Sequence, residues 1–243
     1  MEGAATSLAP SPFQPIPSPV QRAAKANQHA TQTQLPLRVD RTLRVAGAGL
    51  GVVTVAAGVL GAVVTARHGA WFALAFEVVV ALAGLTATLP LVRRRTASGQ
   101  HPVMTLLVAA GTLLVAATLS WIGSGRQLGG VSLTPVLLAR LTAAAALAAL
   151  AGGFVVALRP RWALGRLALG TLLLALAAAP VAVGVAFPAV QQTLAAMHPV
   201  LLAAAATLGF LAWVATASAG VELVATALDP DSWSTSKPSQ QPS

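Results

Sequence analysis

The sequence contains no cysteine and no tyrosine, and charged residues make up only 9% of its 243 positions. Without cysteine there are no disulfides, no thiol nucleophile, no Cys-ligated zinc site and no iron–sulfur cluster. A soluble domain of this length normally carries about 25% charged residues to keep its surface in water. The shortage of charge, together with 56% hydrophobic residues, excludes most soluble classes and predicts a membrane protein.

The apolar residues come in six long runs rather than in a helical or strand period. Each run is close to the roughly 20 residues with which a helix crosses about 30 Å of hydrocarbon. The sequence therefore predicts an all-α membrane protein, a bundle of six transmembrane helices at about 45–66, 71–92, 102–123, 135–158, 167–187 and 199–221.

Polar, low-complexity segments flank the six runs. Residues 1–37 hold six prolines among Ser, Gln and Thr, and residues 229–243 are rich in Asp, Ser, Pro and Gln. Neither segment carries enough apolar surface to offset the entropy lost on ordering. We therefore expect two disordered tails around a transmembrane domain at 38–228.

Arginine and lysine set the expected orientation, because basic residues near helix ends are retained in the cytoplasm. With the N-terminus inside, all but three of the 15 basic residues fall on the inner side, the exceptions being Arg67, Arg126 and Arg140. The chain is therefore predicted to lie in the plasma membrane, with both termini in the cytoplasm. The net charge of +9 does not indicate nucleic-acid binding, since the basic residues lie in short clusters between apolar runs.

Several features of the runs concern helix packing. The pairs Gly47/Gly51 and Ala57/Gly61 are of the small-xxx-small type that lets helices approach closely. Pro180 should kink the fifth helix, because it removes a backbone N–H. His101-Pro102 and His198-Pro199 open the third and sixth runs with a shift of 97 residues. This shift allows two readings, an inverted repeat of three plus three helices, as in many secondary transporters, or two helices that simply begin alike.

Two ionisable residues fall inside the runs, where a charge is costly. Glu77 lies about 9 Å and Arg140 about 8 Å from the outer ends of the second and fourth helices, at 1.5 Å per residue. Their equal depth allows an ion pair. The pair could lock two helices together, Arg140 could instead reach the headgroups alone, or the two residues could face an outer cavity and contact a solute or proton.

His68 and His198 are the other outer-face candidates, the first ending one helix and the second starting another. Two histidines could ligate a haem iron, or a metal together with Glu77, but positions at helix ends favour capping roles. We therefore expect no cofactor and no metal. Glu222, near the inner end of the sixth helix, is interpreted as an anchor opposite Arg93–Arg95 or Arg166.

No catalytic signature accompanies these residues. A phosphate-binding Walker run, His-Glu-x-x-His and Gly-x-Ser-x-Gly are all missing, so we expect no enzyme activity. Two functions remain. The first is a small non-catalytic membrane subunit or scaffold, with the lipid bilayer, another membrane protein or copies of itself as partners. The second is a secondary transporter or channel-like carrier of a small solute, with Glu77 and Arg140 in an outer vestibule.

Overall fold

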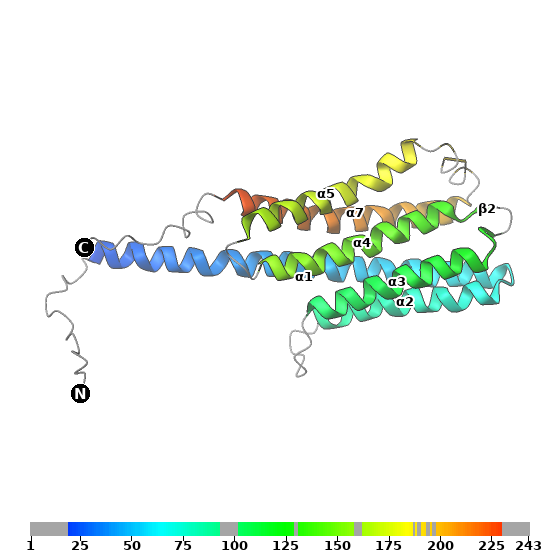
Figure 1. The fold of residues 1–243 in the computed structure, drawn as a ribbon, viewed down its shortest axis with the longest axis horizontal. Coiled ribbons are helices and arrows are strands. Elements are labelled where there is room, and N and C mark those ends of the chain that lie inside the picture. Colours follow the sequence, from blue (N-terminus) through cyan, green and yellow to red (C-terminus); the bar gives the residue numbers. More distant parts are fainter. Residues whose placement is uncertain are drawn as a thin grey trace, which may run out of the picture. The chain divides into compact units, whose positions relative to one another are not determined.

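The computed structural model describes residues 19–92, 102–128, 131–157, 162–186 and 198–229, with single positions at 188, 191–192 and 195. The chain divides into two units, Met1–Leu35 and Pro36–Ser243, and the description below concerns the second. Its elements are the helices and strands labelled in Figure 1: α1 (Pro19–Arg67), α2 (Trp71–Val92), α3 (Pro102–Gly123), β1 (Gln127–Leu128), β2 (Val131–Ser132), α4 (Thr134–Ala157), α5 (Ala163–Ala186) and α7 (Pro199–Leu228).

Six of these helices are long and apolar enough to span a membrane, which confirms the predicted all-α membrane fold. α2 and α3 begin and end at the predicted residues, and α4 is shifted by one residue. The apolar spans of α1 (Arg38–Arg67) and α7 (Pro199–Leu228) are longer than predicted, at 30 residues each. The proline at the first position of α3 and of α7 costs no hydrogen bond, because the first N–H of a helix has no partner within it.

The first predicted tail differs from the structure over part of its length. The backbone of residues 19–37 is helical and belongs to α1, where the sequence predicts disorder. This stretch starts with proline, and Ala, Gln, Lys and Arg make up 10 of its 19 residues; these four have favourable helix propensities even without an apolar face, whereas Thr31, Thr33 and Pro36 do not. Residues 1–18 and 230–243 of the two predicted tails lie outside the described residues.

We call the end of the spans that holds Arg67, Trp71, Gly123, Thr134 and Pro199 the hairpin end, and the end that holds Arg38 and Leu228 the tail end. At the hairpin end, β1 and β2 form a two-stranded antiparallel ladder that the sequence analysis did not foresee, with Gln127 opposite Ser132. The turn from α1 to α2 passes through Gly69, whose positive φ of 68° suits a residue without a Cβ.

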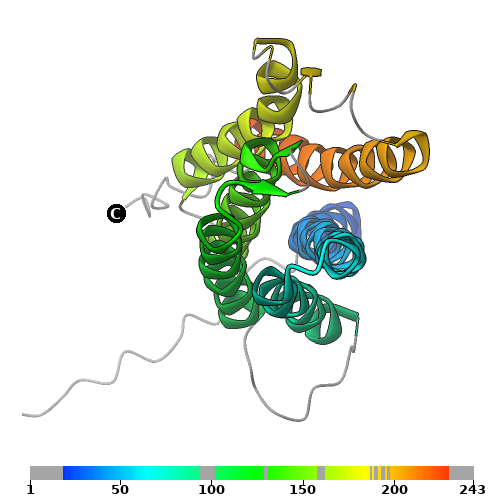
Figure 2. The same ribbon diagram turned by 90° about the vertical axis from the view of Figure 1, so that its right-hand side faces the viewer.

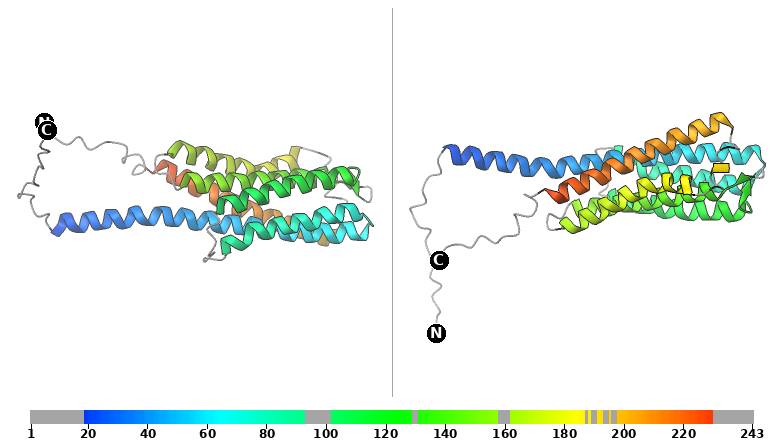
Figure 3. Two further views of the ribbon diagram at one scale, coloured as in Figure 1. Left: turned by 60° about the horizontal axis from the view of Figure 1, so that its bottom comes forward. Right: turned by 90° about the horizontal axis from the view of Figure 1, so that it is seen from above.

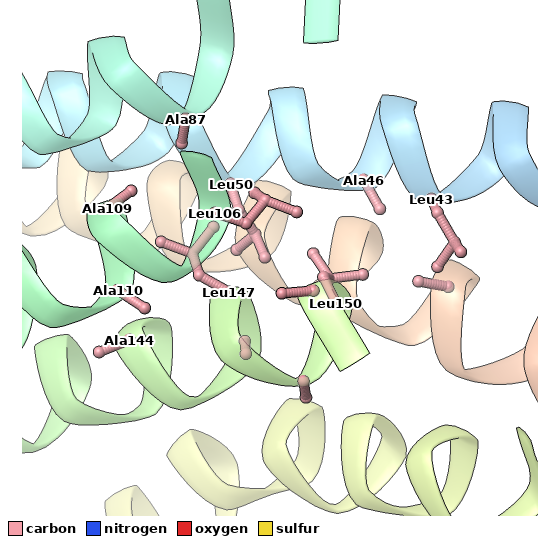
Figure 4. Close-up of a cluster of buried hydrophobic side chains, with 14 of the residues drawn as sticks. Leu43, Ala46, Leu50, Ala87, Leu106, Ala109, Ala110, Ala144, Leu147 and Leu150 are labelled. Carbon is pink, nitrogen blue, oxygen red and sulfur yellow. The ribbon is translucent and has the colours of Figure 1, made fainter. Parts of the chain in front are cut away.

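Leucine and alanine from several helices fill the centre of the second unit. Leu50 of α1, Leu106 of α3 and Leu147 of α4 meet there, and each is at most 2% exposed (Figure 4). α4 packs against α3, α5 and α7 (Figure 2), and Leu43 of α1 reaches Gly153 of α4. Pro180 lies within α5, which continues past it to Ala186.

Glycines bring α1 and α2 into backbone contact. A Cβ on Gly58 would lie 2.6 Å from the Ala81 N atom, and one on Gly84 would lie 2.6 Å from the Gly51 carbonyl oxygen. Gly170 and Gly220 join α5 and α7 in the same way. Gly47, Gly51 and Gly61, which the sequence singled out, all face α2. The inverted repeat stays a prediction.

Candidate functional site

The structure brings Glu77 of α2 and Arg140 of α4 together as a bidentate ion pair. The Arg140 Nη1 atom donates to Glu77 Oε1 at 2.8 Å, and Nη2 donates to Glu77 Oε2 at 2.6 Å. The side chain of Glu77 is 4% exposed and that of Arg140 is 12% exposed. Two parallel charge-assisted bonds of this kind satisfy both carboxylate oxygens and fix the geometry of the guanidinium. The two helices are thus joined by complementary charges at one depth.

Two further residues complete the surroundings of the carboxylate. The buried Ser120 hydroxyl of α3 donates to Glu77 Oε1 at 3.3 Å, so the carboxylate is bound from two helices other than its own. On the side of α1, Gly61 leaves the space that the carboxylate occupies: a Cβ there would collide with Glu77 Oε2 and lie 3.1 Å from Arg140 Nη2. Four helices therefore contribute to one polar cluster, which we call the Glu77 cluster: Gly61, Glu77, Ser120 and Arg140.

Sequence reasoning found the two charges of this cluster and missed the roles of the two small residues. Ser120 was not singled out, and Gly61 was named only as a packing residue. A signal for Ser120 was present, since a hydroxyl three residues before the end of α3 lies within one helical turn of the depth of Glu77, which is six residues into α2. Which way Ser120 faces around the helix axis could not be known without the neighbouring helices.

Among the hollows on the described part of the second unit, two are prominent, and neither of these two is lined by Glu77 or Arg140. The first, of about 430 Å³, is lined only by apolar residues of α1 and α2, among them Gly58, Val59 and Leu82. The second, of about 390 Å³, lies between α2 and α3 and is lined by Phe76, Val79, Gly111, Thr112, Val115 and Ala116. The charged groups of the Glu77 cluster are thus largely buried and are hydrogen-bonded to each other and to Ser120.

The two histidines named by the sequence lie at helix ends. His68 follows α1, and its Nδ1 atom is 2.8 Å from the Val64 carbonyl oxygen. His198 is the N-cap of α7, and its Nδ1 atom accepts from the Val200 N–H at 3.4 Å. Among the described residues there is no group of three or more His, Cys, Asp or Glu side chains that could hold a metal ion.

Glu222 has a different partner from those expected. The Arg38 Nε atom of α1 lies 3.5 Å from Glu222 Oε1, with side chains that are 80% and 20% exposed. The prediction named Arg93–Arg95, which lie outside the described residues, or Arg166. It did not consider Arg38, because it began the first apolar run at residue 45, whereas the apolar span of α1 extends back to Arg38 and brings that residue beside the end of α7.

The aromatic residues at the helix ends follow the pattern of a membrane interface. Trp71 is the first residue of α2 and is exposed, and Trp162 directly precedes α5. Trp121, near the end of α3, packs under Arg126, whose guanidinium carbon is 4.8 Å from the ring centroid. Tryptophan favours this level of a bilayer because its ring is apolar and its N–H can reach water.

Comparison with known proteins gives one short match. A family model, the PGF-CTERM motif, matches residues 76–95, which cover most of α2 and the three arginines that follow it. The match covers too little of the chain to show its family. No characterised protein and no solved structure is significantly similar to the chain. The comparison and the six apolar helices agree that the chain is a membrane-associated protein.

Proposed function

We propose that this chain is a non-catalytic integral membrane subunit or scaffold, which acts by packing against another membrane protein. The single observation that carries the proposal is the enclosure of the Glu77 cluster. The ionisable side chains buried deepest in the spans are satisfied by each other and by Ser120, so their burial is accounted for without a solute. The Glu77 cluster then serves to hold α2, α3 and α4 in register.

The exposed apolar surface also supports a role in contacts. Part of α7 is little covered by the rest of the chain: 6% of its most apolar window is buried, against 39% for the windows of α3 and α4. Lipid chains can cover such a surface, and so can the helices of a partner. A subunit that leaves one helix at its periphery offers that helix for assembly.

The carrier hypothesis has less support. A carrier needs intramembrane polar groups that face water or a substrate for at least part of its cycle. Glu77 and Arg140 use both carboxylate oxygens and two guanidinium nitrogens on each other, and neither hollow includes them. Pro180 within α5 is the feature that favours a carrier, because helices interrupted by proline are common at transporter binding sites.

The proposed location is the plasma membrane, with the hairpin end outside and both termini in the cytoplasm. The support is the distribution of basic residues. Arg67 and Arg126 belong to the hairpin end, whereas Arg38, Arg41 and Arg44 lie at the tail end. An excess of arginine on one side retains that side in the cytoplasm.

Purification of the full chain from its own membrane in mild detergent tests this function. With a tag on the C-terminus, we expect a second membrane protein to co-purify in a fixed ratio, and an untagged chain to serve as the control for adventitious binding. Mass spectrometry of the complex identifies the partner. Recovery of the chain without any other membrane protein, in several detergents, would contradict a subunit role.

A further inference from the structure

The first half of α7 has no buried residue in the second unit. From Pro199 to Ala215 every residue is exposed or partly exposed, and burial begins only at Thr216. Figures 2 and 3 show this part of α7, in orange, leading away from its neighbours toward the hairpin end. The contact of α7 with α5 is anchored farther toward the tail end, where Gly170 meets Gly220.

An aromatic pair stands on this uncovered half. The rings of Phe210 and Trp213 stack with centroids 5.9 Å apart, and the residues are 61% and 46% exposed. Trp213 lies midway along α7, far from the interfacial level that tryptophan favours. Its indole N–H is a donor that hydrocarbon cannot satisfy, and no hydrogen bond of the described residues involves it. The pair therefore combines apolar surface with a donor that needs an acceptor inside the membrane.

The hollow between α2 and α3 offers such an acceptor. A Cβ on Gly111 would have nothing within 4 Å, so the groove is open at that glycine. Beside it, the Thr112 hydroxyl donates its hydrogen to the Val108 carbonyl oxygen at 2.8 Å, which leaves its oxygen free to accept a bond. The other hollow, between α1 and α2, is lined only by apolar residues and has no acceptor to offer.

The aromatic pair and this groove lie at one depth. Gly49 of α1 approaches Ala215 of α7, so Trp213, two residues nearer the hairpin end, is level with about residue 51 of α1. Gly47 approaches Leu106 of α3, so Gly111, five residues nearer the hairpin end, is level with about residue 52. Copies of one protein share their orientation in a membrane, so two surfaces can meet between copies only if their depths agree.

We propose that the Phe210–Trp213 pair of one copy docks into the α2–α3 groove of a second copy, with the Trp213 indole N–H donating to the Thr112 hydroxyl. The two surfaces differ, so the contact is head to tail and generates a ring or a row of copies rather than a two-fold dimer. This inference goes beyond the proposed function, which requires a partner of a different chain.

Cysteine cross-linking tests the contact cleanly, because the natural sequence has no cysteine. Thr207→Cys lies one turn from Phe210 on the same face of α7, and Val115→Cys lies in the groove one turn from Gly111. Both substitutions leave the aromatic pair and Thr112 intact. Co-expressed with different tags and oxidised in the membrane, Thr207→Cys and Val115→Cys chains should form a mixed dimer, while neither variant alone should form one.

The control is Val59→Cys, an exposed position of α1 that lines the apolar hollow. It should not link to Thr207→Cys. A Thr207–Val59 link, a Thr207–Thr207 link, or no link at all would each overturn the proposed groove. Thr112→Val removes the acceptor at nearly constant volume and should lower the association constant about threefold. Trp213→Phe removes the donor together with part of the apolar ring surface, so it should lower the association constant by at least as much.

The outcomes for this contact and for the proposed function are separable. Cross-linked copies that purify without another protein would support the contact and contradict the subunit role. Co-purification of a different membrane protein, without cross-linking between copies, would support the subunit role and contradict the contact between copies.

Discussion

Glu77→Gln and Arg140→Leu should each lower the free energy of unfolding by about 3–5 kcal/mol, and the double variant should lose less than the sum of the two. Each single change leaves one member of the pair with an unbalanced polar group at a depth where hydration is poor. In Glu77→Gln the Arg140 guanidinium loses its counter-charge, and in Arg140→Leu the Glu77 carboxylate keeps only the 3.3 Å bond from Ser120. The double variant has no buried charge left to compensate.

The measurement is equilibrium unfolding in mixed micelles for the wild type, the two single variants and the double variant. The ion pair between Arg38 and Glu222 provides the matched control, because its Arg38 side chain is largely exposed. Their cycle should give a coupling energy below about 1 kcal/mol, as exposed pairs do. If the losses in free energy of unfolding at Glu77 and Arg140 simply add, the coupling energy is zero and the ion pair does not stabilise the protein.

Gly58→Ala should destabilise the protein by about 1–3 kcal/mol through overpacking between α1 and α2. The added methyl group would lie 2.6 Å from the Ala81 N atom, 2.9 Å from Ala81 Cα and 2.9 Å from the Glu77 carbonyl oxygen. All three are backbone atoms, which cannot turn aside as a side chain can. The helices must separate, and the carboxylate of Glu77 moves with its backbone.

Gly111→Ala is the control for this substitution, because the same methyl group on α3 would meet nothing within 4 Å. There, alanine should raise stability by up to about 1 kcal/mol, since it restricts the unfolded chain and favours a helix. Both variants are compared by unfolding in the same detergent at a concentration where the chain is monomeric. Equal effects at the two positions would contradict the close approach of α1 and α2.

The spans and the depths of the charges were predictable from the sequence because the bilayer imposes both. A spanning helix needs a fixed apolar length, and its residues rise by a constant 1.5 Å. Hence α2 and α3 end at the predicted residues, and Glu77 and Arg140 were assigned to one level. The polar start of α1 was not predicted, because the helices were predicted from long apolar runs and residues 19–37 contain none.

The neighbours of each helix were not predictable, because rotation about the helix axis leaves no trace in an apolar run. Gly58, not the predicted Ala57, makes a backbone contact with α2. Ser120 was overlooked as a donor to Glu77 for the same reason, whereas Arg38 was overlooked as a partner of Glu222 because the predicted first span began only at residue 45. In an Ala-, Leu- and Gly-rich sequence, one face of a helix looks like another until its neighbours are known.

The most direct test of the claim that the Glu77 cluster is structural, and closed to water, is thiol labelling of Ser120→Cys. This thiol would be the only one in the chain, and it replaces the buried hydroxyl beside Glu77. A membrane-impermeant thiol reagent should label the exposed Gln127→Cys control from outside intact cells, and should leave Ser120→Cys unmodified until the protein is unfolded. Labelling of folded Ser120→Cys at a rate similar to that of Gln127→Cys would reveal a water-filled vestibule and favour a carrier.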